Sequence, residues 1–150
     1  MKGVYSLIIQ VSEPATINIG ALGQVCFKKG LYAYVGSAQN NLELRIQRHL
    51  RKDKVLFWHI DYLLDNPVAK VVDVLYKDGE KSEECRMADF LLRSGCEPIL
   101  KFGSSDCNCK SHLFLGESFD FLREKMKLTI YKKKIVRSLQ IKQMNHPADL

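Results

Sequence analysis

Hydrophobic and polar positions in the first third of the chain follow the pattern of β-strands. Strand-forming segments rich in β-branched and aromatic residues are GVYSLIIQV at 3–11, TINI at 16–19, QVCF at 24–27 and LYAYVG at 31–36. The KKG at 28–30 suits a tight hairpin between the last two segments. We expect one antiparallel sheet, with Tyr32 and Tyr34 on the same face because side chains alternate along a strand.

The next segment has the spacing of an amphipathic helix at about 41–52. Asn40 is a candidate N-cap, and Leu42, Ile46 and Leu50 form an apolar stripe at i, i+4 and i+8. The opposite, polar side is expected to carry four basic or titratable side chains: Arg45, Arg48, His49 and Lys52.

Further along, FWHIDYLLDN at 57–66 predicts a second short helix that ends before a proline, and AKVVDVLYK at 69–77 predicts a strand. Ser82 is a candidate cap for a third helix that ends just before Gly95. On that helix Glu84 lies in line with the apolar stripe of Met87 and Leu91. A carboxylate in this position requires an explanation.

The last third predicts extended segments at ILKF (99–102) and HLFL (112–115) around a polar loop, and a helix within SFDFLREKMK (118–127). The pattern therefore indicates a small α+β fold of the α/β kind, with a central antiparallel sheet flanked by helices. We place the domain itself at 1–116 and a basic C-terminal extension at 117–150, packed on or trailing from it.

Composition fits this architecture. The chain has 150 residues, 46% of them hydrophobic, which is enough for one domain with its own core. Its five cysteines are an odd number, no segment resembles a signal peptide, and the apolar runs are far shorter than a membrane span. We therefore expect a cytoplasmic protein with reduced thiols and no membrane association.

The formal net charge is +6 and is unevenly distributed. Residues 28–54 hold seven Lys or Arg against two acids, and residues 117–150 hold eight against four, whereas 55–116 is acidic with seven against ten. A basic surface favours polyanions such as nucleic acid. The alternative, a solvated face that only aids solubility, explains the charge equally well.

Several residues could form a site for phosphodiester hydrolysis. A strand that ends at Gly36 lets the backbone approach a ligand closely, and Tyr5 and Tyr34 lie on strands that can be neighbours. Arg45 can hold a phosphate by two parallel hydrogen bonds, and Glu84 can bind a divalent metal ion. Each residue also has a structural interpretation. The tyrosines could be packing residues, Arg45 could be an ordinary surface residue, and Glu84 could interact favourably with the helix dipole.

The cysteines allow a second kind of metal site. Cys107, Cys109 and His112 are close in sequence, and Cys85 or Cys96 could complete a Zn²⁺ site. The C-x-C-x-x-H spacing is not a usual one, so we consider zinc unlikely and favour a loop of free thiols beside the active site.

Two short motifs carry a family resemblance. GVY at 3–5 and YVG at 34–36 resemble the two name-giving motifs of the GIY-YIG nuclease superfamily, each with valine in place of isoleucine. YVGSAQNNLELRIQRHL is similar to the second strand, loop and arginine-bearing helix of that superfamily. FWHIDYLL, ECRMA and FGSSDCNCKSHLF resemble a branch of small proteins common in archaea, so the resemblance covers about residues 2–116.

The resemblance implies a metal-dependent endonuclease that cuts DNA, of a repair or structure-selective type. By position, Tyr5 would be the base or would orient water, Tyr34 and Arg45 would align the phosphate, and Glu84 would bind one Mg²⁺ or Mn²⁺. Gly36 would lie close to the substrate.

Contacts with nucleic acid are expected from further side chains: Arg48, His49, Lys52, Lys132 and Lys133. One departure is the 28 residues between Tyr5 and Tyr34, which stand much closer together in typical members. The alternatives are a nucleic-acid-binding module that does not cut and an enzyme or regulator that acts on another phosphate compound.

Overall fold

The computed structural model describes residues 1–131. Lys132 and Lys133 lie outside the described residues. The strands are β1 (Gly3–Val11), β2 (Ala15–Asn18), β3 (Gln24–Phe27), β4 (Gly30–Ala38), β5 (Ala69–Lys77), β6 (Glu97–Pro98), β7 (Leu113–Gly116) and β8 (Thr129–Ile130). The helices are α1 (Leu42–Leu50), α2 (His59–Leu64), α3 (Ser82–Arg93) and α4 (Phe121–Lys125), with a 3-10 turn η1 at Gly20–Leu22.

Six strands form one antiparallel sheet in the order β6-β7-β4-β1-β5-β8. The central strand β1 pairs with β4 on one side and β5 on the other, and Tyr5 lies opposite Gly36. The expected α+β fold with a central antiparallel sheet is therefore confirmed. Because β8 pairs with β5, the sheet extends beyond residue 116 into the segment that we assigned to the extension.

The predicted hairpin between β3 and β4 is wrong. β3 pairs with β2 in a separate two-stranded sheet, and β4 pairs with β1 and β7. β1 occupies one edge of β4 through nine residue pairs, and β7 occupies the other edge through four pairs. Because both edges are paired along Leu31–Tyr34, β3 has no free edge of β4 to pair with there.

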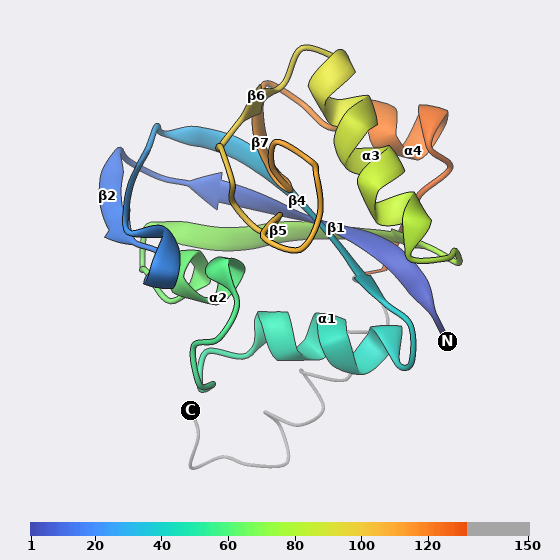
Figure 1. The fold of residues 1–150 in the computed structure, drawn as a ribbon, viewed down its shortest axis with the longest axis horizontal. Coiled ribbons are helices and arrows are strands. Elements are labelled where there is room, and N and C mark those ends of the chain that lie inside the picture. The colour runs from blue at the N-terminus through green and yellow to red at the C-terminus, as the bar shows by residue number, and fades with distance from the viewer. Residues whose placement is uncertain (132–150) are drawn as a thin grey trace.

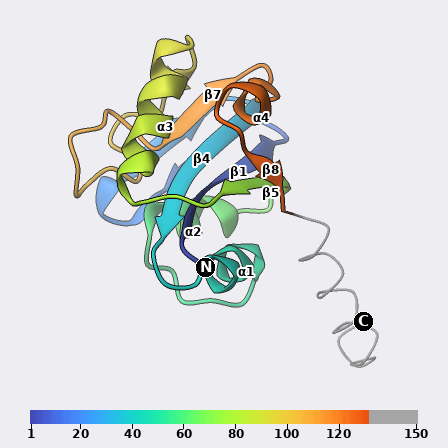
Figure 2. The same cartoon turned by 90° about the vertical axis from the view of Figure 1, so that its right-hand side faces the viewer.

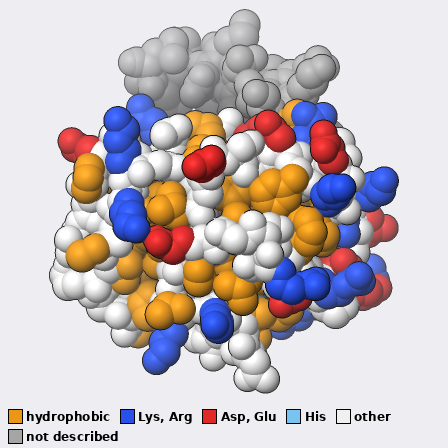
Figure 3. Space-filling model, turned by 90° about the horizontal axis from the view of Figure 1, so that it is seen from above, with side chains coloured by type: hydrophobic (Ala, Val, Ile, Leu, Met, Phe, Trp, Pro, Cys, Tyr) orange, Lys and Arg blue, Asp and Glu red, His pale blue; other side chains and the backbone are white. Residues whose placement is uncertain are grey.

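The alternation of side chains along β1 divides the core into two layers. Tyr5, Leu7 and Ile9 pack with α1 and α2, whereas Val4 and Ile8 pack with α3 and α4. Figure 1 shows α1 and α2 below the sheet and α3 and α4 above it, and Figure 2 shows the strands side by side between these layers. On the α3 and α4 side, basic and acidic side chains are interspersed around apolar patches (Figure 3).

Several predicted boundaries differ from the structure. Asn41, not Asn40, caps α1, because its Oδ1 accepts a hydrogen bond from Leu44 N at 3.0 Å. Ser82 is the first residue of α3 and provides no side-chain cap. ILKF is not a strand, because the extended residues are Glu97–Pro98 and a turn follows. Tyr32 and Tyr34 do share a face, as predicted.

Within residues 1–131, no helix is both long and apolar enough to cross a lipid bilayer. Localisation in the cytoplasm stays a prediction.

The close approach of β1 to β4 at Gly36 can be tested by mutation. A Cβ at Gly36 would overlap Cζ and Oη of Tyr5. We expect Gly36→Ala to lower the free energy of unfolding by about 1–3 kcal/mol, since the buried Tyr5 ring has to move. Urea denaturation measures the change. Gly79→Ala is the control, since its nearest contact is the flexible Glu83 side chain at 3.3 Å, and equal losses in both variants would contradict the packing argument.

Candidate functional site

One cavity of about 880 Å³ opens where β1, β4, α1, α3 and the loop before β7 meet. Tyr5, Tyr34, Arg45 and Glu84 all line it, together with Gly36. These residues come from four different elements, so the fold brings together the side chains that we predicted as catalytic. Arg48 also reaches the cavity, whereas Lys52 and His49 line a smaller pocket on another side of α1.

His49 is the clearest correction to the predicted site. We expected it on the polar side of α1, but it is 2% exposed and lies among Tyr5, Tyr34 and Trp58, with ring centroids 5.4, 6.0 and 5.9 Å away. Its Nε2 shares a hydrogen bond of 2.6 Å with Tyr5 Oη. His49 lies seven residues after Leu42 and three after Ile46, so helical spacing places it beside the apolar stripe, where the aromatic rings and the Tyr5 hydroxyl enclose it.

Burial sets the protonation of this cluster. It raises the pKa of Tyr5 and of Tyr34 above the usual value for a phenol, so both stay protonated at neutral pH. Burial also lowers the pKa of His49 to about 3, with the charge of Arg45 acting in the same direction and that of Asp61 opposing it. His49 is therefore a neutral imidazole that can exchange a hydrogen bond with a neutral phenol.

Arg45 is positioned by a backbone carbonyl and an indole ring. Its Nη1 donates to Ser37 O at 2.9 Å, and its guanidinium lies 4.5 Å from the centroid of Trp58. Both contacts direct the side chain along the cavity wall, with the guanidinium half-buried at the lining. A planar cation held in this way is suited to an anionic ligand.

Arg48 has a structural partner that the sequence analysis missed. Its two terminal nitrogens donate to both carboxylate oxygens of Asp61, each at 2.9 Å. Asp61 is fully buried and also accepts from the backbone N–H groups of Phe57 and Trp58. Burial favours the neutral acid, but Arg48 and the two N–H groups outweigh it and lower the pKa of Asp61. Arg48 thus joins α1 to α2, and a role in binding nucleic acid would be additional to this one.

Lys52 is directed away from the cavity. Its Nζ donates to Leu64 O at 3.5 Å. Its predicted contact with nucleic acid therefore lies apart from the four cavity residues.

Glu84 lies on the wall of the cavity opposite α1. Burial raises the pKa of Glu84, and the charge of Asp106 adds to this shift, while Lys81, Ser37 and Arg45 counteract it. Ser105 and Asp106 line the same cavity. This position explains why Glu84 lies in line with the apolar stripe of α3. The first turn of α3 extends beyond the core, so the carboxylate lines the cavity.

Trp58 and His59 also line the cavity, Asp61 lies buried behind them, and none of the three was predicted as a site residue. The Trp58 ring lies beside both guanidinium groups, with Arg48 at 4.4 Å, and His59 Nδ1 accepts a hydrogen bond from Gly103 N at 2.9 Å. Their signal was the polar residues within FWHIDYLL, a segment that we interpreted as a helix and as part of the family resemblance but not as part of the site.

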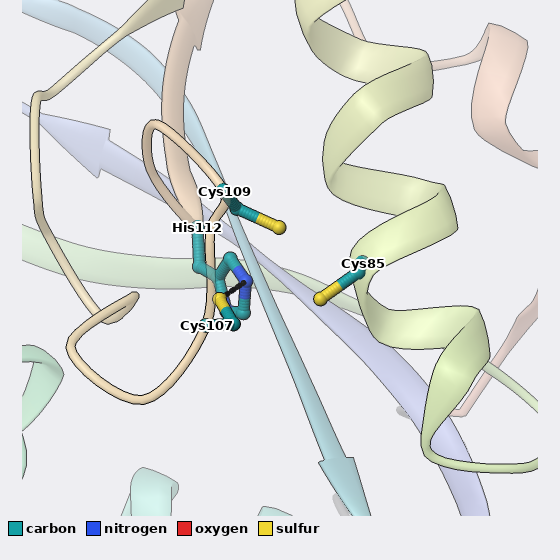
Figure 4. A group of neighbouring side chains, drawn as sticks. All are labelled: Cys85, Cys107, Cys109 and His112. Atoms are coloured by element: carbon teal, nitrogen blue, oxygen red, sulfur yellow. Dashed lines mark hydrogen bonds between the residues drawn. The ribbon is translucent and has the colours of Figure 1, made fainter.

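A second group of side chains corrects our view of the cysteines. Cys85 on α3 meets Cys107, Cys109 and His112 of the loop before β7, and their ligand atoms all lie within 4.8 Å of one another. Figure 4 shows the four side chains directed toward one space. This Cys₃His group can hold a metal ion of the zinc type. The spacing within the loop argued against zinc because it showed only three of the ligands, and the fourth comes from α3, which is distant in sequence.

The Asp61 contacts predict a large effect on stability. Asp61→Asn removes the charge that compensates Arg48, so we expect a loss of about 3 kcal/mol in the free energy of unfolding. Chemical denaturation measures it. Asp65→Asn on the exposed end of the same helix should change stability by less than about 0.5 kcal/mol, and a small effect at Asp61 would show that the pair contributes little.

The pKa of His49 predicts a pH dependence. Between the unfolded pKa near 6.5 and the folded value of about 3, the unfolded chain binds a proton that the folded one does not, so stability falls as the pH falls. We expect His49→Gln to remove about 1 kcal/mol of the loss between pH 6 and pH 5.

Denaturation at both pH values for the two proteins measures this difference. The neighbouring Tyr5 and Arg48 have a raised pKa and Asp61 has a lowered pKa, so these three groups keep one charge state in this range. Identical pH slopes would show that His49 is not buried as a neutral ring.

Comparisons with known proteins leave the function open. Neither the curated proteins nor the solved structures contain a match to this chain. A family model described as a domain of unknown function, DUF123, matches residues 4–135. That range covers β1 to β8 and therefore every element of the cavity. The chain belongs to the DUF123 family.

Proposed function

We propose that this protein is a metal-dependent endonuclease that hydrolyses phosphodiester bonds in DNA, of a repair or structure-selective type. One observation carries the proposal: Tyr5, Tyr34, Arg45 and Glu84 are distant in sequence, yet all line one cavity of about 880 Å³. Convergence of a cation, two hydroxyls and a carboxylate in a cavity of this size is typical of an enzyme site.

Arg45 would bind the scissile phosphate. Its contacts with Ser37 O and Trp58 fix its orientation before substrate arrives, so little conformational freedom is lost on binding. As charge develops on the phosphate oxygens, the fixed guanidinium would stabilise the transition state. Tyr34, which lines the same cavity, would donate a hydrogen bond from its hydroxyl group to a phosphate oxygen.

Tyr5 and His49 would orient the attacking water. When His49 carries its proton on Nδ1, its Nε2 accepts a hydrogen bond from the Tyr5 hydroxyl over the 2.6 Å contact. The lone pairs of the phenol oxygen are then free to accept a hydrogen bond from the attacking water and so to orient it. His49 would act through Tyr5, because it does not itself line the cavity.

Glu84 and Asp106 fit a divalent cation. Both are oxygen donors that line the same cavity, and their mutual repulsion contributes to the raised pKa of Glu84, which a bound cation would relieve. Mg²⁺ or Mn²⁺ held there would neutralise charge on the phosphate.

The strand pairing supports the resemblance to GIY-YIG nucleases. The two motifs are separated by 28 residues, but β1 and β4 pair directly, with Tyr5 opposite Gly36. The added residues form the separate sheet of β2 and β3.

Basic side chains outside the cavity would bind the DNA backbone. Residues 132–150 hold five Lys or Arg, including Lys132 and Lys133, against one acid. Lys52 would add a contact on another side of α1, apart from the cavity, and binding should weaken with added salt.

A binding module without cutting activity is the second candidate. The observation that favours it is the 1% exposure of Tyr5 and the raised pKa of its hydroxyl, which keep the phenol protonated at neutral pH and unable to take a proton from water. Cleavage assays separate the two functions.

The test uses branched, nicked and single-stranded DNA with Mg²⁺ or Mn²⁺. We expect cleavage by the wild type and a loss of at least about 100-fold in kcat for Arg45→Ala, since transition-state charge is no longer stabilised. Glu84→Gln should lose cleavage to a similar degree but retain DNA binding. Thermal unfolding checks that both variants fold.

The matched controls are Arg51→Ala at the end of α1 and Asp89→Asn on the exposed face of α3. Both should cut as the wild type does. Binding without cutting in the wild type would support the module, and cutting that persists in Glu84→Gln would exclude the assigned metal ligand.

A further inference from the structure

We propose that Cys85, Cys107, Cys109 and His112 bind one structural Zn²⁺ ion, which fastens the loop at 103–111 to α3. This site is separate from the cavity and does not depend on the nuclease proposal. It takes a different class of metal from the oxygen ligands of Glu84 and Asp106.

The geometry is close to that of a tetrahedral site. All four ligand atoms lie within 4.8 Å of one another, and Cys107 Sγ is 3.4 Å from His112 Nε2. A tetrahedral ion with bonds of about 2.3 Å to sulfur separates its ligand atoms by about 3.8 Å. Small rotations of the side chains shown in Figure 4 would therefore close the group around an ion.

The chemistry of the donors selects the metal. Three thiolates and an imidazole are soft or borderline ligands, which suit zinc and do not suit Mg²⁺ or Mn²⁺. Four protein ligands fill a tetrahedral shell, so no position is left for water or substrate. The site is therefore structural rather than catalytic.

The four residues come from two parts of the chain that need a connection. The base of the loop is held by backbone hydrogen bonds, with Lys101 N donating to Lys110 O at 2.7 Å and His112 N donating to Phe102 O at 2.8 Å. At the tip, Cys107 N donates to Ser104 O at 3.4 Å, a longer and weaker contact. A metal bond to Cys85 would tie this tip to the first turns of α3.

The connection would also shape the cavity. Cys85 follows Glu84 directly, and Cys107 follows Asp106 directly. Because each cysteine is next to one of the carboxylates in sequence, binding both cysteines to one ion would also restrict the positions of Glu84 and Asp106 in the cavity lining. The zinc ion would thus position the groups for a second cation without contacting it.

The experiment measures zinc in the full chain. The protein is reduced, stripped of metal, reconstituted with Zn²⁺ and desalted, and we expect about one Zn²⁺ per chain by elemental analysis. Co²⁺ should substitute and give the thiolate charge-transfer and d–d absorption bands of a tetrahedral site. Zn²⁺ should raise the Tm by about 5–10 °C relative to protein with a chelator.

Cys109→Ser and His112→Ala should lower zinc affinity at least tenfold. The control Cys26→Ser, at an exposed thiol on β3 outside the group, should bind zinc as the wild type does. Because a ligand variant can fail to fold, hydrogen exchange of residues 103–110 in the wild type, with and without zinc, provides a second test. Zinc should slow it.

Three outcomes would overturn the proposal. They are a reconstituted wild type without zinc, equal zinc binding by Cys109→Ser and Cys26→Ser, and a disulfide between Cys85 and Cys107 or Cys109 in protein kept under reducing conditions. None of these outcomes depends on DNA cleavage, so the zinc proposal and the nuclease proposal can be refuted independently.

Discussion

The pairing of β1 with β4 in one register is the constraint on which the site depends. Tyr5 lies opposite Gly36, and the missing Cβ there leaves room for the phenol ring against the backbone of β4. The ring can then reach His49 on α1, while Tyr34 stands on the same face two residues before Gly36. A slip of one residue would turn one phenol to the opposite face of the sheet and separate the pair.

The cavity wall is stabilised by charges that compensate one another away from water. Trp58 lies beside two guanidinium groups, and the second of these, Arg48, is neutralised by the buried Asp61. Asp61 is in turn saturated with hydrogen bonds from Arg48 and two backbone N–H groups. Arg45 differs from Arg48 in this respect. Among the described contacts, its hydrogen-bond acceptor is the backbone carbonyl of Ser37 and not a carboxylate, so its positive charge stays available for a ligand.

The local parts of the fold were predictable from sequence, and the long-range contacts were not. The strands β1, β4 and β5 follow from their runs of β-branched and aromatic residues, and the helices α1 and α3 follow from the spacing of their apolar residues. The partner of β3 and the contact of His49 with Tyr5 depend on segments elsewhere in the chain, which periodicity does not describe. For the same reason the sequence left open whether Cys85 or Cys96 joins Cys107, Cys109 and His112, because the answer depends on how α3 packs.

The small sheet of β2 and β3 has a consequence for how related proteins are recognised. It is inserted between the two motif strands, and within residues 1–131 its strands pair only with each other, beside η1 and α2. Its length can therefore change during evolution without moving either tyrosine. A pattern search that demands a fixed interval between the motifs would overlook such chains, whereas one that scores each strand with its own partners and leaves the interval open would find them.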